Sequence, residues 1–289
     1  MSICQTHGRI VICGEHAVVY GQPALVGSIN LGLTAAVTSH PQKPTNNYLH
    51  LILTTFASNF NVDTSTLSLS INGNLPPKRG LGSSTTAAAA SLQALAHHFH
   101  LRLTKDQLFN LVMAIEHQIY PTVSGMDQTA VVYGGLHIFQ NTPHGLSKTS
   151  LKSTPLQQQQ FWLIDSGQAT ESTAEMVQQV RDKKQETRNK KVEEIGKVTR
   201  RFISKIKTGQ FSPTLIKENQ SLLDELGVVG DKARNMVQQI EAIGGVTKIT
   251  GAGGIKSGSG MLLCYHPDPS RLQHLVSKHL WSSIPVSFT

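Results

Sequence analysis

The stretch Pro76-Pro77-Lys78-Arg79-Gly80-Leu81-Gly82-Ser83-Ser84-Thr85-Thr86, followed by Ala87 to Ala90, organises the rest of the chain. Its two prolines end an extended segment, because proline lacks an N–H donor and cannot continue a central strand. The glycines permit a tight turn, and the alanines favour a helix that reaches about residue 98. Ser83 and Ser84 are expected to cap this helix.

A glycine loop that opens onto a helix N-terminus is a candidate anion site. Its free N–H groups and the positive end of the helix dipole both attract negative charge. The alternative is an ordinary loop-to-helix junction with a good cap. Short glycine motifs also occur by chance, so the local pattern leaves both interpretations open.

Composition indicates a globular protein. The chain has 289 residues, 39% hydrophobic and 15% charged, which suits one large or two medium domains. No run reaches the roughly 18 apolar residues of a membrane helix, so no membrane partner is expected. The first seven residues lack the plan of a signal peptide. Cys4, Cys13 and Cys264 lie far apart without CxxC spacing, which favours a reducing cytoplasm over zinc or a disulfide framework.

The net charge of +8 is concentrated in a basic run between residues 181 and 207. Glu186, Glu193 and Glu194 interrupt the run, which is typical of a solvated helix face with charge pairs. The run has no interleaved aromatic residues for base stacking, so no nucleic-acid partner is expected. The histidines of 97–100 occupy adjacent helical positions that do not converge on one metal ion; they indicate a helix end that favours imidazole.

Apolar spacing predicts a mixture of strands and helices without regular βαβ alternation, which indicates an α+β fold in two lobes. We expect an N-terminal lobe at 1–150 and a C-terminal lobe at 151–289, with the boundary near residues 145–160. Predicted strands cover 10–13, 31–38, 67–71, 136–139, 161–165, 261–265 and 286–288. Predicted helices cover 51–58, the segment from the glycine loop to 98, 105–119 with Thr104 as cap, 173–207, 217–226, 231–243 and 270–279. A polar loop is expected from Pro41 to Asn47, and Pro121 is expected to end the helix at 105–119.

Phosphoryl transfer needs a phosphate cradle, a divalent cation, charge stabilisation and a group that orients the acceptor. The loop is not GxxxxGK[ST], and the chain lacks a Rossmann fingerprint and the protein-kinase signatures. A loop hydroxyl and a carboxylate are candidate magnesium ligands. The candidate bases are Glu15, Asp127 and Asp165, each within two residues of a glycine, where a carboxylate also commonly bonds turn amides.

Three segments together resemble, in order and spacing, the motifs of the GHMP small-molecule kinases. They are residues 8–21, with Gly14-Glu15-His16-Ala17-Val18-Val19-Tyr20-Gly21, then residues 76–86, then Lys248-Ile249-Thr250-Gly251-Ala252-Gly253-Gly254. The first string, together with Ser124-Gly125-Met126-Asp127, is most similar to family members that phosphorylate mevalonate. The resemblance implies a two-lobed fold, with an N-terminal lobe like ribosomal protein S5 and a ferredoxin-like C-terminal lobe.

The resemblance also implies roles for individual residues. Asp127 would take or orient the proton of the acceptor hydroxyl, and Arg9 would neutralise charge beside it. Ser84 and Glu116 would hold Mg²⁺. The residues expected to bind ATP are Lys78, Arg79, Gly80, Leu81, Gly82, Ser83, Ser84, Thr85, Gly251 and Gly253. Those expected at the acceptor are Glu15, His16, Thr250 and Ala252.

Two departures from the family pattern stand out. Arg9 occupies a position that is usually lysine, and arginine keeps its charge but cannot share a proton near neutral pH. Residues 255–259 lengthen the third motif, and Lys256 within them either contacts a phosphate or carboxylate or faces solvent.

Phosphorylation of the mevalonate C5 hydroxyl is therefore the expected activity, with ATP and mevalonate as partners. The alternatives are a family kinase for another small alcohol or for phosphomevalonate, a related decarboxylase, and a non-catalytic nucleotide-binding homologue. A homodimer is compatible with the sequence, which does not determine the oligomeric state.

Overall fold

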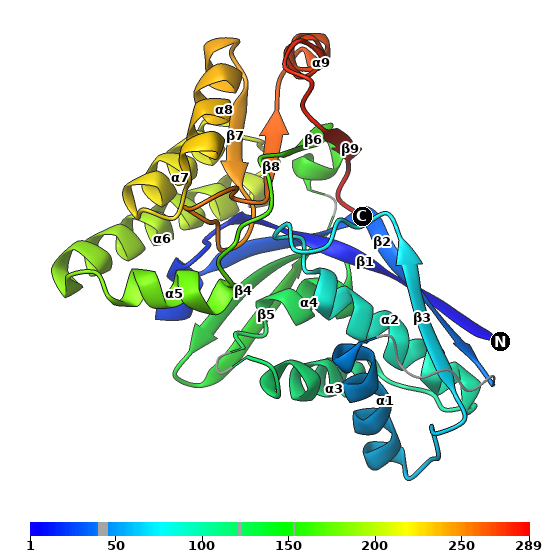
Figure 1. Cartoon of the computed structure of the whole chain (residues 1–289). Coiled ribbons are helices and arrows are strands. Elements are labelled where there is room, and N and C mark those ends of the chain that lie inside the picture. The colour runs from blue at the N-terminus through cyan, green and yellow to red at the C-terminus, as the bar shows by residue number, and fades with distance from the viewer. Residues whose placement is uncertain (40–45, 121–122, 153) are drawn as a thin grey trace.

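The computed structural model describes residues 1–39, 46–120, 123–152 and 154–289. It consists of two antiparallel sheets with helices packed around them (Figure 1). Most of the polar loop predicted at 41–47, and the helix end predicted at Pro121, lie outside the described residues. In the described part, no helix combines the length and apolar character that crossing a membrane requires.

The first sheet is built around its longest strand, β2 (Ala24–Thr38). One edge of β2 pairs with β1 (Ser2–Cys13); the other pairs with β3 (Ser68–Gly73) and, through residues 24–27, with β4 (Leu136–Thr142). β4 forms a hairpin with β5 (Gly145–Leu151). Ile29 of β2 also bridges Phe288, so residues at opposite ends of the sequence meet in this sheet.

Residues 10–13 are apolar without alternation because both faces of the first sheet are covered. Ile10 and Ile12 pack into a core that also contains Phe161 and Phe202, from the second half of the chain. Val11, between them, packs on the opposite side. The helices on that side are α1 (Asn47–Phe60), α2 (Ser83–His98), α3 (Lys105–His117) and α4 (Met126–Tyr133) (Figure 1). Thr104 caps α3 through a capping box with Gln107, as predicted.

The second sheet has the strand order β7-β8-β6-β9. Its strands are β6 (Phe161–Asp165), β7 (Val246–Ile249), β8 (Met261–Tyr265) and β9 (Ser283–Val286). Between β6 and β7 lie α5 (Thr173–Arg181), α6 (Gln185–Lys207), α7 (Thr214–Glu225) and α8 (Asp231–Ala242), and α9 (Pro269–Lys278) connects β8 to β9. A β-α-β-β-α-β order with antiparallel neighbours is the ferredoxin-like arrangement.

Several boundaries differ from those predicted. The helix predicted at 173–207 is two helices, separated at residues 182–184. The segment 126–133 is helical, and β5 and β7 were not predicted. The first sheet ends at Leu151 and the second begins at Phe161, while the division into lobes at 1–150 and 151–289 stays a prediction.

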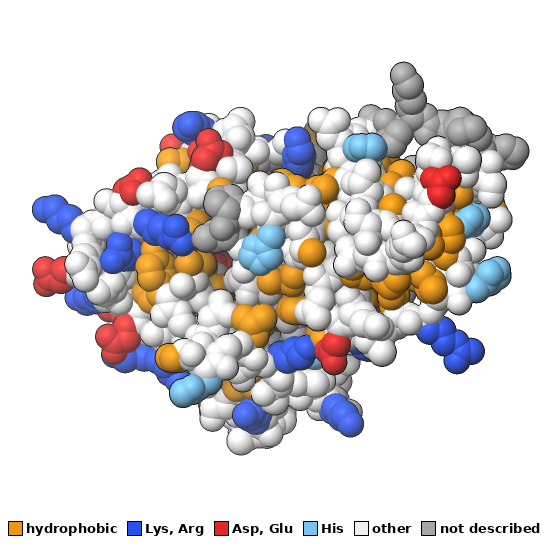
Figure 2. Space-filling view, turned by 90° about the horizontal axis from the view of Figure 1, so that it is seen from below, with side chains coloured by type: hydrophobic (Ala, Val, Ile, Leu, Met, Phe, Trp, Pro, Cys, Tyr) orange, Lys and Arg blue, Asp and Glu red, His pale blue; other side chains and the backbone are white. Residues whose placement is uncertain are grey.

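Most of the basic run lies on α6. Its Lys191, Lys197 and Arg201 pair with glutamates on α6 and α7. Basic and acidic side chains are also intermingled across the face in Figure 2. This arrangement fits a solvated helix surface.

Candidate active site

The glycine loop, which we define as residues 76–82, connects β3 to the start of α2. Gly82 is the N-cap of α2 with φ of 72°, a conformation that glycine adopts readily. The expectation that Ser83 and Ser84 cap the helix is wrong: both are already helical, and among the described residues no side chain caps this end. The first-turn N–H groups therefore have no side-chain acceptor, which is the arrangement an anion site requires.

Gly82→Ala should distinguish two roles of this glycine, which are to adopt a positive φ and to leave room for the Arg9 side chain. The new Cβ would lie 2.9 Å from Arg9 Cγ and 3.2 Å from Arg9 Nε, so Arg9 must move. Gly209→Ala is the matched control, because Gly209 has φ of 75° and open space around it. We expect both variants to lose about 1–2 kcal/mol of stability in urea unfolding, because each forces a positive φ on alanine. Only Gly82→Ala should also lower kcat; equal kcat values in the two variants would contradict a role for this contact.

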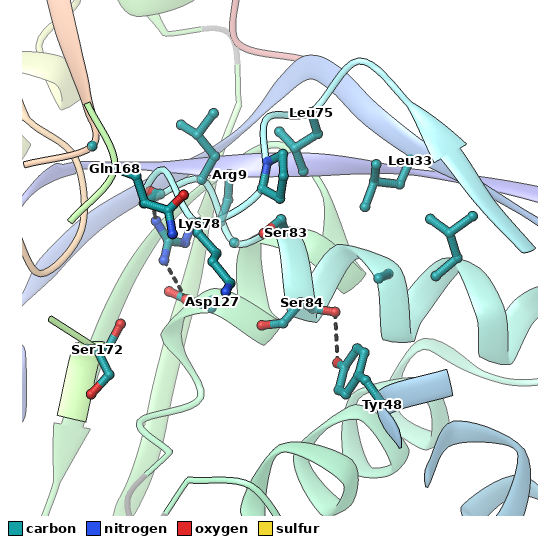
Figure 3. Close-up of a pocket in the computed structure, with 18 of the residues that line it drawn as sticks. Arg9, Leu33, Tyr48, Leu75, Lys78, Ser83, Ser84, Asp127, Gln168 and Ser172 are labelled. Atoms are coloured by element: carbon teal, nitrogen blue, oxygen red, sulfur yellow. Dashed lines mark hydrogen bonds and ion pairs between the residues drawn. The ribbon is translucent and has the colours of Figure 1, made fainter. Parts of the chain in front are cut away.

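Arg9 and Asp127 meet at the end of the glycine loop. Arg9 projects from β1 and donates to Asp127 Oδ2 (2.5 Å) and to the Gly80 carbonyl (2.6 Å) (Figure 3). The Arg9 side chain is 7% exposed, and that of Asp127, in the first turn of α4, is 28% exposed. The guanidinium thus fixes the carboxylate while leaving it open to a ligand.

Glu116 lies beside this pair at the end of α3. Its Oε1 accepts from the Ser84 hydroxyl (3.1 Å) and the Thr85 hydroxyl (2.7 Å), and its Oε2 accepts from Gln128 Nε2 (2.6 Å). Burial raises the pKa of Glu116, and the nearby charge of Asp127 raises it further, against the lowering effect of the two hydroxyls. Sequence reasoning missed Gln128, although it directly follows Asp127.

Two cavities open at this point. The large cavity, about 1250 Å³, lies along the glycine loop and the N-terminal end of α2 (Figure 3). The small cavity, about 190 Å³, is lined by residues of the segment 15–19, of α4 and of α5. The residues that line both cavities are Arg9, Gly80, Ser84, Tyr120, Asp127, Thr173 and Ala252. Arg9 and Asp127 therefore stand where the two cavities adjoin.

The third motif packs onto the glycine loop from the second sheet. The Thr250 hydroxyl donates to the Gly80 carbonyl (3.1 Å), and the Ala252 carbonyl lies 2.9 Å from His16 Nε2. Thr250 and Gly253 line the large cavity, Gly251 lines the small one, and Ala252 lines both. Burial lowers the pKa of His16, which favours the neutral ring.

The inserted residues 255–259 are held by the segment that follows β6. The Ile255 and Lys256 N–H groups donate to Glu171 Oε1 (3.3 and 3.0 Å), and the Ser257 hydroxyl donates to the Gln168 carbonyl (2.7 Å). The Lys256 side chain is exposed, which favours the solvent alternative of the two left open by the sequence.

Glu15 and Lys248 form a buried ion pair between the first and third motifs. Their side chains are 1% and 0% exposed. Lys248 also donates to the Val11 carbonyl (3.1 Å), and Asn219 donates to the second oxygen of Glu15 (3.1 Å). Glu15 lines the small cavity, but both carboxylate oxygens are already occupied. Lys248 belongs to the third motif, but sequence reasoning assigned it no role.

The remaining loop residues have different environments. Lys78, Gly80, Leu81, Gly82, Ser83 and Ser84 line the large cavity, and the Leu81 side chain is also part of the core. Thr85 is buried against Glu116. The Arg79 side chain does not line the large cavity and instead contacts Asp165 and Gln168. The cavity wall also includes Tyr48 and the segment 168–173, which no sequence pattern had indicated.

This fold and these motifs occur together in known proteins. Residues 47–135 match the GHMP kinases N terminal domain. The matched segment is thus similar to the N-terminal domain of GHMP kinases, and the predicted α+β fold class is confirmed.

The proteins that this chain resembles include mevalonate kinases. The mevalonate kinase of Archaeoglobus fulgidus is 28% identical, with 87% of this chain and 89% of the relative covered. The Methanococcus jannaschii mevalonate kinase structure superposes with a TM-score of 0.84 at 19% identity, covering 99% of this chain and 98% of that one. The L. major mevalonate kinase in complex with R-mevalonate gives 0.82 at 19% identity, covering 100% and 96%.

Proposed function

We propose that this protein transfers the γ-phosphoryl group of ATP to the C5 hydroxyl of mevalonate, giving 5-phosphomevalonate. The observation that carries the proposal is the common wall of the two cavities, where Arg9, Ser84 and Asp127 stand between a large and a small chamber. A donor in one chamber and an alcohol in the other would meet at Asp127. The similarity to mevalonate kinases over most of the chain supports mevalonate as the alcohol.

In this mechanism, the N–H groups at the start of α2 hold the phosphates. Asp127 accepts or orients the proton of the acceptor hydroxyl as the oxygen attacks phosphorus. Arg9 keeps Asp127 in place and balances negative charge that develops between the chambers. A carboxylate of ordinary acidity is a weak base, so positioning and charge neutralisation supply much of the rate.

The residues around Glu116 fit a magnesium ion. A hydroxyl and a carboxylate, both hard oxygen donors, converge from Ser84 and Glu116 at 3.1 Å. Mg²⁺ commonly takes one or two protein oxygens and completes its shell with water and phosphates. The raised pKa of Glu116 indicates that burial disfavours its ionised form, and a bound cation would stabilise that form. When bound, the ion would neutralise negative charge on the phosphates.

Glu116→Gln should weaken Mg²⁺ binding and change how that binding responds to pH. The Glu116 carboxylate must be ionised to hold a cation. Because its pKa is raised, acidification should begin to lower the Mg²⁺ affinity at a higher pH than it would with an ordinary glutamate. We expect the variant to need at least about tenfold more Mg²⁺ for half-maximal rate. The measurement is Mg²⁺ titration of the initial rate at several pH values. Nucleotide protonation is common to both proteins, so identical pH profiles would contradict the assignment of Glu116.

The acceptor can be identified by coupled ADP release from the purified protein with a panel of alcohols. We expect turnover with R-mevalonate and formation of 5-phosphomevalonate. Turnover only with phosphomevalonate or another small alcohol would establish a different kinase of the same family. ATP binding without turnover of any alcohol would establish a nucleotide-binding homologue.

Each chamber is built within one chain, so a single copy suffices for the proposed reaction; a homodimer stays a prediction. We propose a cytoplasmic location, which suits the three cysteines, all of them free.

A further inference from the structure

Three cationic side chains surround the glycine loop, and each has a different environment. Arg9 is bound to Asp127 and the Gly80 carbonyl. Arg79 is bound to Asp165 and Gln168. Lys78 lines the large cavity and extends into it in Figure 3, and within the described part of the chain no carboxylate forms an ion pair with it.

The backbone explains why neighbouring side chains point in opposite directions. Lys78 and Gly80 have φ of 53° and 77°, so the residues on both sides of Arg79 adopt a left-handed backbone conformation. Lys78 and Gly80 consequently line the large cavity, and Arg79 between them does not. A positive φ at a non-glycine residue such as Lys78 is strained and is maintained by its surroundings.

Arg79 is attached to the second sheet through both its side chain and its backbone. Its Nε donates to Asp165 at the end of β6 (3.0 Å), and its Nη1 donates to Gln168 Oε1 (3.3 Å). The Arg79 carbonyl accepts from the Met261 N–H at the start of β8 (3.0 Å). The side chains of Arg79 and Asp165 are each 21% exposed, so the pair is partly shielded from solvent.

Asp165 is itself held in place. One of its oxygens accepts from the Gly167 N–H (2.8 Å), which orients the carboxylate towards the loop. Releasing Arg79 to a phosphate would leave this fixed carboxylate without its cation. The neighbouring Lys78, which forms no ion pair with any described carboxylate, already supplies a positive charge on the cavity side.

We propose that Arg79 is a positioning residue that fastens the glycine loop to the second sheet through Asp165, and that Lys78 is the loop side chain that contacts the anionic donor. The proposal rests on the proposed function, since it assumes that the large cavity takes the nucleotide. It assigns opposite roles to two adjacent basic residues that the sequence alone treats as equivalent phosphate ligands.

Binding of MgATP by calorimetry distinguishes the two roles of Arg79. The variants are Arg79→Met, Asp165→Asn, the double variant of these two, and Lys78→Met. If Arg79 fastens the loop through Asp165, Arg79→Met and Asp165→Asn should each raise the Kd for MgATP by a similar factor, about fivefold. The double variant should then bind MgATP no more weakly than either single variant. Lys78→Met should raise the Kd about tenfold, and its effect should multiply with that of Asp165→Asn.

Direct binding of phosphate by Arg79 would give a different pattern of Kd values. If Arg79 binds phosphate directly, Arg79→Met weakens MgATP while Asp165→Asn leaves the Kd unchanged or lowers it, and the proposal is overturned. An unchanged Kd in Lys78→Met overturns the role of Lys78. Arg201→Met is the control, because it removes a surface Arg–Glu pair between α6 and α7 and should leave the Kd unchanged.

Urea unfolding of the nucleotide-free variants tests the attachment without relying on the proposed function. The double-mutant cycle should show positive coupling between positions 79 and 165. Additive effects on unfolding would overturn the proposal even if the protein phosphorylates mevalonate. If positions 79 and 165 are coupled in a protein that fails to bind MgATP, the attachment of the loop is supported and the proposed function is overturned instead.

Discussion

Asp127→Asn should lower kcat by roughly 10²- to 10⁴-fold, the range attributed to a positioned acid–base group. Asparagine keeps the shape of the side chain but removes the charge that accepts or orients the acceptor proton. The Kd for MgATP should change little, because the N–H groups at the start of α2 and Ser84 are untouched. Rapid-quench measurement of phosphoryl transfer in a single turnover, with calorimetry of MgATP binding, checks both expectations.

The same substitution leaves Arg9 without its counter-charge. Since the Arg9 side chain is only 7% exposed, we expect Asp127→Asn to lose about 1–3 kcal/mol of stability. The double variant Arg9→Met/Asp127→Asn should regain part of that stability while staying inactive. Recovery of activity with stability would mean that the single variant failed by unfolding. A near-normal kcat in Asp127→Asn would show that the assignment of Asp127 is wrong.

Lys248→Met should have the largest effect on stability. It leaves the Glu15 carboxylate, 1% exposed, without its cation at the junction of the first and third motifs. Removing one partner of a buried ion pair typically costs about 3–5 kcal/mol, because the other charge stays buried and unpaired. Urea unfolding followed by circular dichroism measures this loss.

The pair Glu15→Gln/Lys248→Met distinguishes a charge effect from lost packing. We expect the double variant to recover most of the lost stability, because neither buried charge remains. Lys197→Met is the control: this lysine is 62% exposed, pairs with Glu193 on the same helix, and should cost less than about 1 kcal/mol. A Lys248→Met variant no less stable than the control would contradict a structural role for the buried pair.

Sequence patterns predicted the elements whose burial is periodic. The capped helix α3 and the alternating strand β3 are examples. α4 was not predicted, because its Thr129, Val131, Val132 and Tyr133 are residues that favour strands, and tertiary packing overrides that preference. β5 is exposed along nearly its whole length, so it has no apolar alternation to read.

For the site, the motifs indicated which residues gather and could not give the direction of their side chains. Arg9 and Asp127 are 118 positions apart, and only the family resemblance joined them. Lysine is rarely buried, so nothing local indicates that Lys248 pairs with Glu15 in the interior. Likewise, no sequence rule separates Lys78 from Arg79, because their opposite directions depend on backbone dihedrals at the loop.

The strand order of the first sheet also sets the timing of folding. β2 exchanges hydrogen bonds with β4 more than a hundred residues later, where Ala24 pairs with Phe139, and Ile29 bridges Phe288. Such distant pairings incur loop-closure entropy before they contribute stability, and they slow folding. On the ribosome, β1 and β2 must therefore wait for β4 until about half of the chain is synthesised, and for the bridge to Phe288 until nearly all of it is. Over that interval they would expose strand edges that other chains or chaperones can bind.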